Sequence, residues 1–221
     1  ASVYTEEGRF LPQDIFVEGD CFVDCADKVS DKTEIDASGC MAIPGLTDIH
    51  FHGCMGHDFC DGTLDAIDTM AAYEASVGVT TIVPATMTLD EDTLYTICKT
   101  AKEYREGEQK EKRARLCGIN MEGPFVAPSK KGAQNGAYIR TPDIAMYDKL
   151  NDASGNMVKL IAIAPEVDGA MEFIEKKHGE VVISLAHTAT DYNTAVCAFK
   201  KGASHVTHLY NAMNPYTHRV P

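Results

Sequence analysis

The chain has 221 residues, 44% of them hydrophobic, and a formal net charge of −13 at pH 7. This length suits one large domain, or one large and one small domain. The acidic balance argues against a nucleic-acid partner, which needs basic patches, and no apolar run is long enough to cross a membrane. Eight cysteines without a C-x-x-C pair, and the lack of an export signal, predict free thiols and a cytoplasmic location.

Residues 1–45 predict a small β-rich module. Glycine, proline and polar turns separate its short apolar runs. The strand candidates lie at residues 2–4, 14–17, 21–23 and 33–35. Because such short strands cannot enclose a large core, we expect a small N-terminal domain, 1–45, beside a larger domain, 46–221.

From Met41 onward, short apolar runs alternate with amphipathic stretches. We predict strands at residues 42–51, 80–85, 116–121, 158–164, 181–185 and 205–209. We predict helices at residues 64–77, 91–106, 142–150, 169–177 and 191–201. Six strand–helix repeats indicate a parallel sheet or barrel, in which ligands bind at the carboxyl ends of the strands.

Candidate metal ligands occur at those carboxyl ends. His50 and His52 lie at the end of the first strand, and alternation along a strand predicts that they point to the same face. Glu122 ends the third strand, where a buried carboxylate is costly unless it is paired or coordinated. His187 and His208 lie near the ends of the fifth and sixth strands. Five such ligands at one rim suit one or two divalent transition metals, such as Zn²⁺ or Fe²⁺.

Three motifs resemble those of a known family. The segment PGLTDIHFHG at residues 44–53 is similar to the first-strand signature of the amidohydrolase superfamily. The segments NMEGPF at 120–125 and HLYNAM at 208–213 resemble, more narrowly, the N-acetylglucosamine-6-phosphate deacetylase family within it. The resemblance runs from the β-rich module to the last residue.

This resemblance implies a metal-dependent (β/α)8 TIM barrel of the α/β class, with a small β-sandwich module. Only about six βα units, strands 1–6, fit into this chain, so we expect the C-terminal part of the barrel to be missing from it. The resemblance assigns the main metal to Glu122, His187 and His208. It assigns a second metal to His50 and His52.

The resemblance also implies substrate-binding positions: Ala133, Asn211, Ala212 and Arg219. An arginine such as Arg219 suits a phosphate group. Many relatives have histidine after Ala133, whereas this chain has Gln134, which can hydrogen-bond a sugar hydroxyl but carries no charge.

The implied reaction is hydrolysis of the acetamide of N-acetylglucosamine 6-phosphate to glucosamine 6-phosphate and acetate, in amino-sugar catabolism, by a homodimer. The metal would activate a water, and an aspartate ending strand eight would relay its proton. No aspartate follows His208, so we expect the catalytic aspartate to lie beyond Pro221 and these 221 residues to be inactive alone. Two alternatives stay open: another metal-dependent amidohydrolase, such as a cyclic amidase, or a non-catalytic sugar-phosphate binder.

Overall fold

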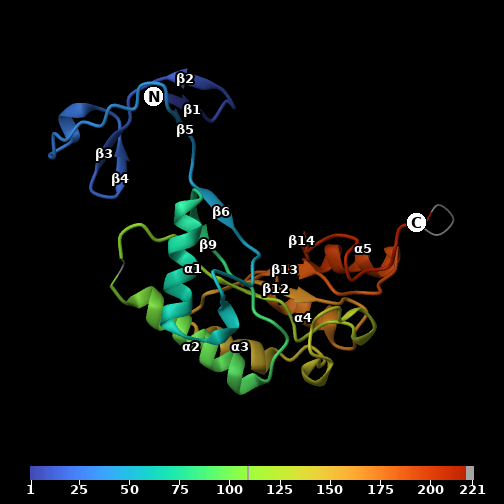
Figure 1. Cartoon of the computed structure of the whole chain (residues 1–221). Coiled ribbons are helices and arrows are strands. Elements are labelled where there is room, and N and C mark those ends of the chain that lie inside the picture. The colour runs from blue at the N-terminus through green and yellow to red at the C-terminus, as the bar shows by residue number, and fades with distance from the viewer. Residues whose placement is uncertain (109, 218–221) are drawn as a thin grey trace. The chain divides into compact units, whose positions relative to one another are not determined.

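The structure, a computed structural model, describes residues 1–108 and 110–217 (Figure 1). The chain divides into two compact units, Ala1–Gly45 and Leu46–Pro221. Among the described residues, no helix is long and apolar enough to cross a lipid bilayer.

The N-terminal unit is built from short strands. β1 (Ser2–Tyr4) pairs antiparallel with β2 (Phe10–Pro12) and parallel with β5 (Met41–Ala42). β3 (Phe16–Glu18) and β4 (Cys21–Val23) form an antiparallel pair, followed by the 3-10 helix η1 (Ala26–Lys28). None of these 45 residues is fully buried. This unit therefore has no buried core of its own.

Two predictions near this unit are wrong, and one strand was missed. Residues 33–35 form no strand, and the strand expected over residues 42–51 is interrupted. The interruption falls at Pro44-Gly45, because proline cannot donate to a ladder and glycine weakens a strand. β5 ends at Ala42, and β6 (Leu46–Asp48) begins beyond the break. β2 was not predicted.

The larger unit contains a row of parallel strands in chain order. The first group consists of β6, β9 (Val79–Ile82) and β10 (Arg115–Leu116). The second consists of β11 (Ile119–Met121), β12 (Val158–Ile163), β13 (Val182–Leu185) and β14 (His205–Val206). A parallel bridge between Ala85 and Asn120 connects the two groups. The predicted parallel arrangement is confirmed, and the described residues form no closed barrel.

Five helices connect these strands and lie along the outer side of the row (Figure 1). They are α1 (Leu64–Ser76), α2 (Glu91–Glu106), α3 (Ile144–Ala153), α4 (Ala170–Lys177) and α5 (Tyr192–Lys201). Four of them begin after a side chain that accepts a hydrogen bond from a first-turn N–H, which stabilises a helix start. These caps are Thr63, Asp90, Asp143 and Asp191.

The remaining short elements lie in the loops. β7 (Gly53–Cys54) and β8 (His57–Asp58) form a small antiparallel pair that leads into η2 (Phe59–Asp61). Two further 3-10 helices, η3 (Pro128–Lys130) and η4 (Gly136–Tyr138), lie between β11 and α3.

The hydrophobic core lies between the strands and the helices. Its largest fully buried side chains include Tyr147, Phe59, Phe125 and Phe173. The ring centroids of Phe125 and Phe173 are 5.4 Å apart, and those of Tyr147 and Phe173 are 5.6 Å apart. This packing anchors the segment that immediately follows Glu122, and it thereby fixes the carboxyl ends of the central strands.

Candidate metal centre

The centre is organised around the carboxylate of Glu122. This residue directly follows β11, and only 2% of it is exposed. The next residue, Gly123, has φ +101°, and a Cβ there would lie 2.0 Å from Thr88 Oγ1. Only glycine fits such a position, so the chain can turn tightly just after the carboxylate.

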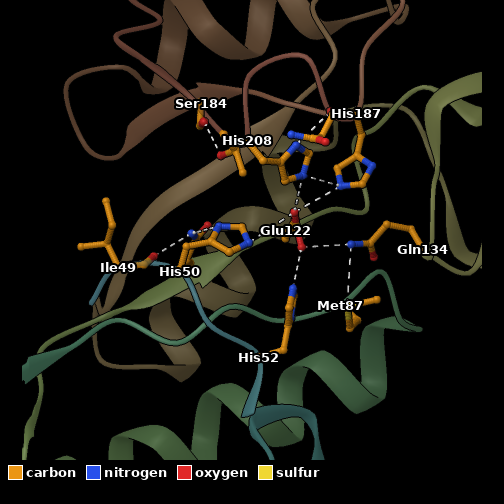
Figure 2. A network of polar contacts seen from close by, with 12 residues as sticks. Ile49, His50, His52, Met87, Glu122, Gln134, Ser184, His187 and His208 are labelled. Atoms are coloured by element: carbon orange, nitrogen blue, oxygen red, sulfur yellow. Dashed lines mark hydrogen bonds and ion pairs between the residues drawn. The ribbon is translucent and has the colours of Figure 1, made fainter. Parts of the chain in front are cut away.

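Four histidines direct their Nε2 atoms toward this carboxylate (Figure 2). His208 and His187 lie 3.1 and 3.2 Å from Oε1 of Glu122. His50 lies 3.5 Å from the same oxygen, and His52 lies 3.0 Å from Oε2. The five residues expected from the sequence to be metal ligands therefore lie together in the structure.

The histidines reach Glu122 from loops that follow the strands. His50 and His52 lie beyond the end of β6, and both face Glu122. His187 and His208 follow β13 and β14 and have φ values of 45° and 34°. Non-glycine residues in this left-handed region are strained, and such strain persists only where the surroundings impose it.

The outer ring nitrogens of two histidines contact backbone carbonyls. His187 Nδ1 lies 2.9 Å from the Lys130 carbonyl oxygen, and His208 Nδ1 lies 3.0 Å from that of Asn211. A carbonyl can only accept, so each Nδ1 carries the hydrogen and each neutral ring has its Nε2 lone pair free. His52 Nδ1 is buried and has no hydrogen-bond partner among the described residues.

This arrangement brings three acceptors together. The Nε2 atoms of His187 and His208 are 3.2 Å apart, and both lie close to Oε1 of Glu122. Two lone pairs and a carboxylate oxygen repel one another unless they share a cation, either a proton or a metal ion. The three residues therefore fit a divalent transition metal, and the triad of His50, His52 and Glu122 offers a second set of ligand atoms.

Burial and the contacts among these residues also shift their pKa values. Burial disfavours the ionised Glu122, but hydrogen bonds with His187 and His52 outweigh it and hold its pKa well below the usual range. The hydrogen bond to Glu122 raises the pKa of His52. Burial opposes protonation of His187, yet its bonds to Glu122 and to the Lys130 carbonyl raise its pKa. For His50, burial prevails over the charge of Glu122 and lowers the pKa.

The expected substrate positions lie in two loops beside His187. A Cβ on Gly132 would lie 3.5 Å from His187 Cε1 and 3.9 Å from Ala212 Cβ, so the loop carrying Ala133 adjoins Ala212. Ala133 and Asn211 are exposed, and Ala212 is half-buried. The two loops are tied together where Lys130 Nζ donates to the Met213 carbonyl at 3.2 Å. Arg219 lies outside the described residues.

Gln134 contacts Glu122 directly. Its side chain is buried, with Nε2 donating to Glu122 Oε2 at 3.1 Å and Oε1 accepting from the Thr88 N–H at 2.6 Å. Both ends of its amide are therefore occupied within the protein. This side chain therefore holds the Glu122 carboxylate in place.

Sequence reasoning also missed Asn120. Asn120 and Glu122 are two residues apart around the end of β11, and only 2% of Asn120 is exposed. Its Nδ2 atom lies 2.9 Å from the Ile49 carbonyl oxygen and 3.2 Å from His50 Nδ1. Strand alternation places residues i and i+2 on the same face, so the position of Glu122 could have indicated Asn120 as its neighbour.

The chain resembles proteins of known family. The family model "Amidohydrolase family" matches residues 41–218. An N-acetylglucosamine-6-phosphate deacetylase of Bacillus subtilis is 36% identical over 82% of this chain and 46% of its own length. An N-acetylgalactosamine-6-phosphate deacetylase of Escherichia coli O157:H7 is 33% identical over 86% of this chain and 49% of its own length.

A solved structure shows the same likeness. It is a mutant N-acetyl-D-glucosamine-6-phosphate deacetylase from Mycobacterium smegmatis in complex with N-acetyl-D-glucosamine-6-phosphate. It superposes with a TM-score of 0.75 at 30% identity, over 87% of this chain and 50% of that one. The chain thus spans about half the length of the relatives it matches, and it has the TIM-barrel-type fold of the matching family.

Proposed function

Because the chain belongs to the amidohydrolase family, we propose that its protein hydrolyses the acetamide of an N-acetylated amino-sugar 6-phosphate. The products would be acetate and the free amino-sugar phosphate, as in amino-sugar catabolism. The observation that carries this proposal is the convergence of four histidine Nε2 atoms on the buried Glu122. The names of the relatives supply the substrate class.

The proposed ligands of the main ion are Glu122, His187 and His208, and those of a second ion are His50 and His52. Zn²⁺ and Fe²⁺ both suit imidazole with a carboxylate. A bound ion of this kind supplies Lewis-acid activation of water and of the amide carbonyl. The protein's own contribution is to hold four imidazoles in a fixed arrangement around one buried carboxylate.

The proposed substrate contacts are the loops beside His187, through Ala133, Asn211 and Ala212. Against a net charge of −13, a phosphate needs a local cation, and Arg219 is our candidate for it.

The finer architecture is also part of the proposal. We assign the parallel strands to strands one to six of an amidohydrolase barrel, and count β10 and β11 as one strand. In chain order these are β6, β9, β10 with β11, β12, β13 and β14. The N-terminal unit would be part of a small β-sandwich. We further propose a cytoplasmic homodimer.

An acetate-release assay on the natural protein that carries this chain tests the proposal. We expect release from N-acetylglucosamine or N-acetylgalactosamine 6-phosphate, loss of activity with a chelator, and recovery on adding Zn²⁺ or Fe²⁺. The unphosphorylated sugars serve as matched controls and should react much more slowly. Binding of a sugar phosphate without acetate release would favour the non-catalytic binder instead.

A further inference from the structure

Asn120 is held in a fixed position beside His50. The backbone N–H of Asn120 donates to the Pro84 carbonyl at 2.9 Å, and its carbonyl accepts from the Thr86 N–H at 2.9 Å. Asn120 lies near the end of β11, and these two hydrogen bonds attach it to the segment that follows β9. They fix the backbone that carries its buried side chain. From there Nδ2 reaches both the Ile49 carbonyl oxygen and His50 Nδ1.

The Ile49 carbonyl fixes which way the Asn120 amide points. The side-chain atom 2.9 Å from that oxygen must be the NH₂ group, because an amide oxygen there would face another acceptor. The same NH₂ group lies 3.2 Å from His50 Nδ1. A donor at this distance requires Nδ1 to be the acceptor, so the hydrogen of the neutral His50 ring is on Nε2.

This tautomer is the opposite of that in the main triad. The carbonyls at Lys130 and Asn211 place the hydrogen of His187 and His208 on Nδ1 and leave Nε2 free to ligate. In His50 the hydrogen is instead on Nε2, the nitrogen that lies 3.5 Å from Glu122 Oε1, so these two atoms need no added cation between them.

We infer that Asn120 is a positioning residue that holds His50 in the tautomer unfit for ligation and so makes the two metal positions unequal. The inequality of the two metal positions rests on the proposed metal dependence, whereas the tautomer of His50 does not. The ion held by Glu122, His187 and His208 binds first. Loading of the position at His50 and His52 requires the His50 hydrogen to move to Nδ1, where it meets the Asn120 NH₂ group. Changes in such outer partners typically alter metal affinity by about 10- to 100-fold.

The tautomer can be read directly in the metal-free wild-type protein. Long-range ¹H–¹⁵N correlation spectra of ¹⁵N-histidine-labelled protein, at a pH where the rings are neutral, distinguish the two forms. We expect the Nε2–H pattern for His50 and the Nδ1–H pattern for His187 and His208, with His50 assigned by its loss in His50→Asn. An Nδ1–H pattern for His50 overturns the inference, whatever the protein does with metal or sugar.

Titration with Zn²⁺ tests the consequence, with bound metal counted at equilibrium in a metal buffer. We expect two steps in the wild type, the second at least 10-fold weaker than the first. Asn120→Asp places an acceptor at Nδ1, and Asn120→Leu removes the donor. Both should strengthen the second step, the aspartate variant by about 10-fold or more, with little change in the first.

The pair of variants separates the tautomer from a simple charge effect. If only Asn120→Asp strengthens the second step, added negative charge is the cause and the inference fails. It fails equally if neither variant changes the ratio of the two steps. Circular dichroism confirms that each variant is folded, and if neither folds, the wild-type spectra decide the question alone.

Discussion

Replacing Glu122 by glutamine keeps the shape of the side chain and removes its charge. In the structure, Oε1 faces His187 and His208, while Oε2 accepts from Gln134 and lies 3.0 Å from His52 Nε2. If the new amide oxygen takes the Oε1 position, its NH₂ group faces the Gln134 NH₂ group, which lies 3.1 Å from that site. The reverse orientation puts the NH₂ group among the ligand atoms. Neither orientation restores the wild-type contacts.

Breaking a buried charged pair by removing one partner costs about 3–5 kcal/mol. At 1.4 kcal/mol per tenfold, the metal affinity of Glu122→Gln should fall by about 10²- to 10³-fold or more. The assay is equilibrium dialysis against a metal buffer, with bound metal measured by mass spectrometry and the fold checked by circular dichroism.

Glu166→Gln is the matched control for this prediction. Its carboxylate lies just after the next strand, β12, and accepts hydrogen bonds from Thr188 Oγ1 and the Ala189 N–H. It belongs to neither group of candidate ligands. We expect this variant to bind metal like the wild type. A folded Glu122→Gln protein with wild-type affinity, or an equal loss in both variants, would refute the assignment of Glu122.

Three further predictions concern other positions. Arg219→Ala should raise KM for the phosphorylated sugar far more than for the unphosphorylated one; equal effects would show a structural role. Burial and then the charge of Asp48 raise the pKa of Glu74 above 4.5, so the ionised group costs stability as pH rises beyond that value. Glu74→Gln should therefore raise Tm at pH 7.5 but not at pH 4, and thermal melts at both values check this. Gly123→Ala should lower the free energy of unfolding by more than about 1 kcal/mol, because φ +101° and the Thr88 side chain exclude a Cβ at this position. Urea unfolding measures this change, and unchanged stability would contradict the steric argument.

The parts of the fold that depend on local pattern could be predicted from the sequence. The helices α1 and α2 begin at the expected residues because a capping side chain precedes an amphipathic run in each. The carboxyl end of β13 likewise lies at Leu185, where the predicted strand ends, whereas β14 ends at Val206, three residues before its predicted end at residue 209. The N-terminal unit was harder, because its strands are three residues or shorter and no residue in it is fully buried. Without burial, hydrophobic periodicity carries little information.

The parts of the site that depend on contacts between distant residues could not be predicted. Gln134 and Thr88 are 46 positions apart, and Asn120 and His50 are 70 apart. Sequence reasoning therefore found the candidate ligands but assigned Gln134 to the sugar and gave Asn120 no role. The outer partners are set by which loops meet over the strand ends, and that is a property of the folded chain.

Charge connects the metal ligands to the proposed substrate. The protein carries −13 overall, and its central site holds one buried carboxylate surrounded by imidazoles that are neutral when they ligate. A divalent ion beside one carboxylate would leave this site with a local positive charge, although the surface as a whole repels anions. The same ion that polarises an amide would then favour an anionic substrate over its neutral analogue. The single charge of the buried Glu122 would only partly neutralise a divalent cation, so a net positive charge would remain. A second carboxylate in place of Gln134 would cancel that charge and with it the attraction for an anionic substrate.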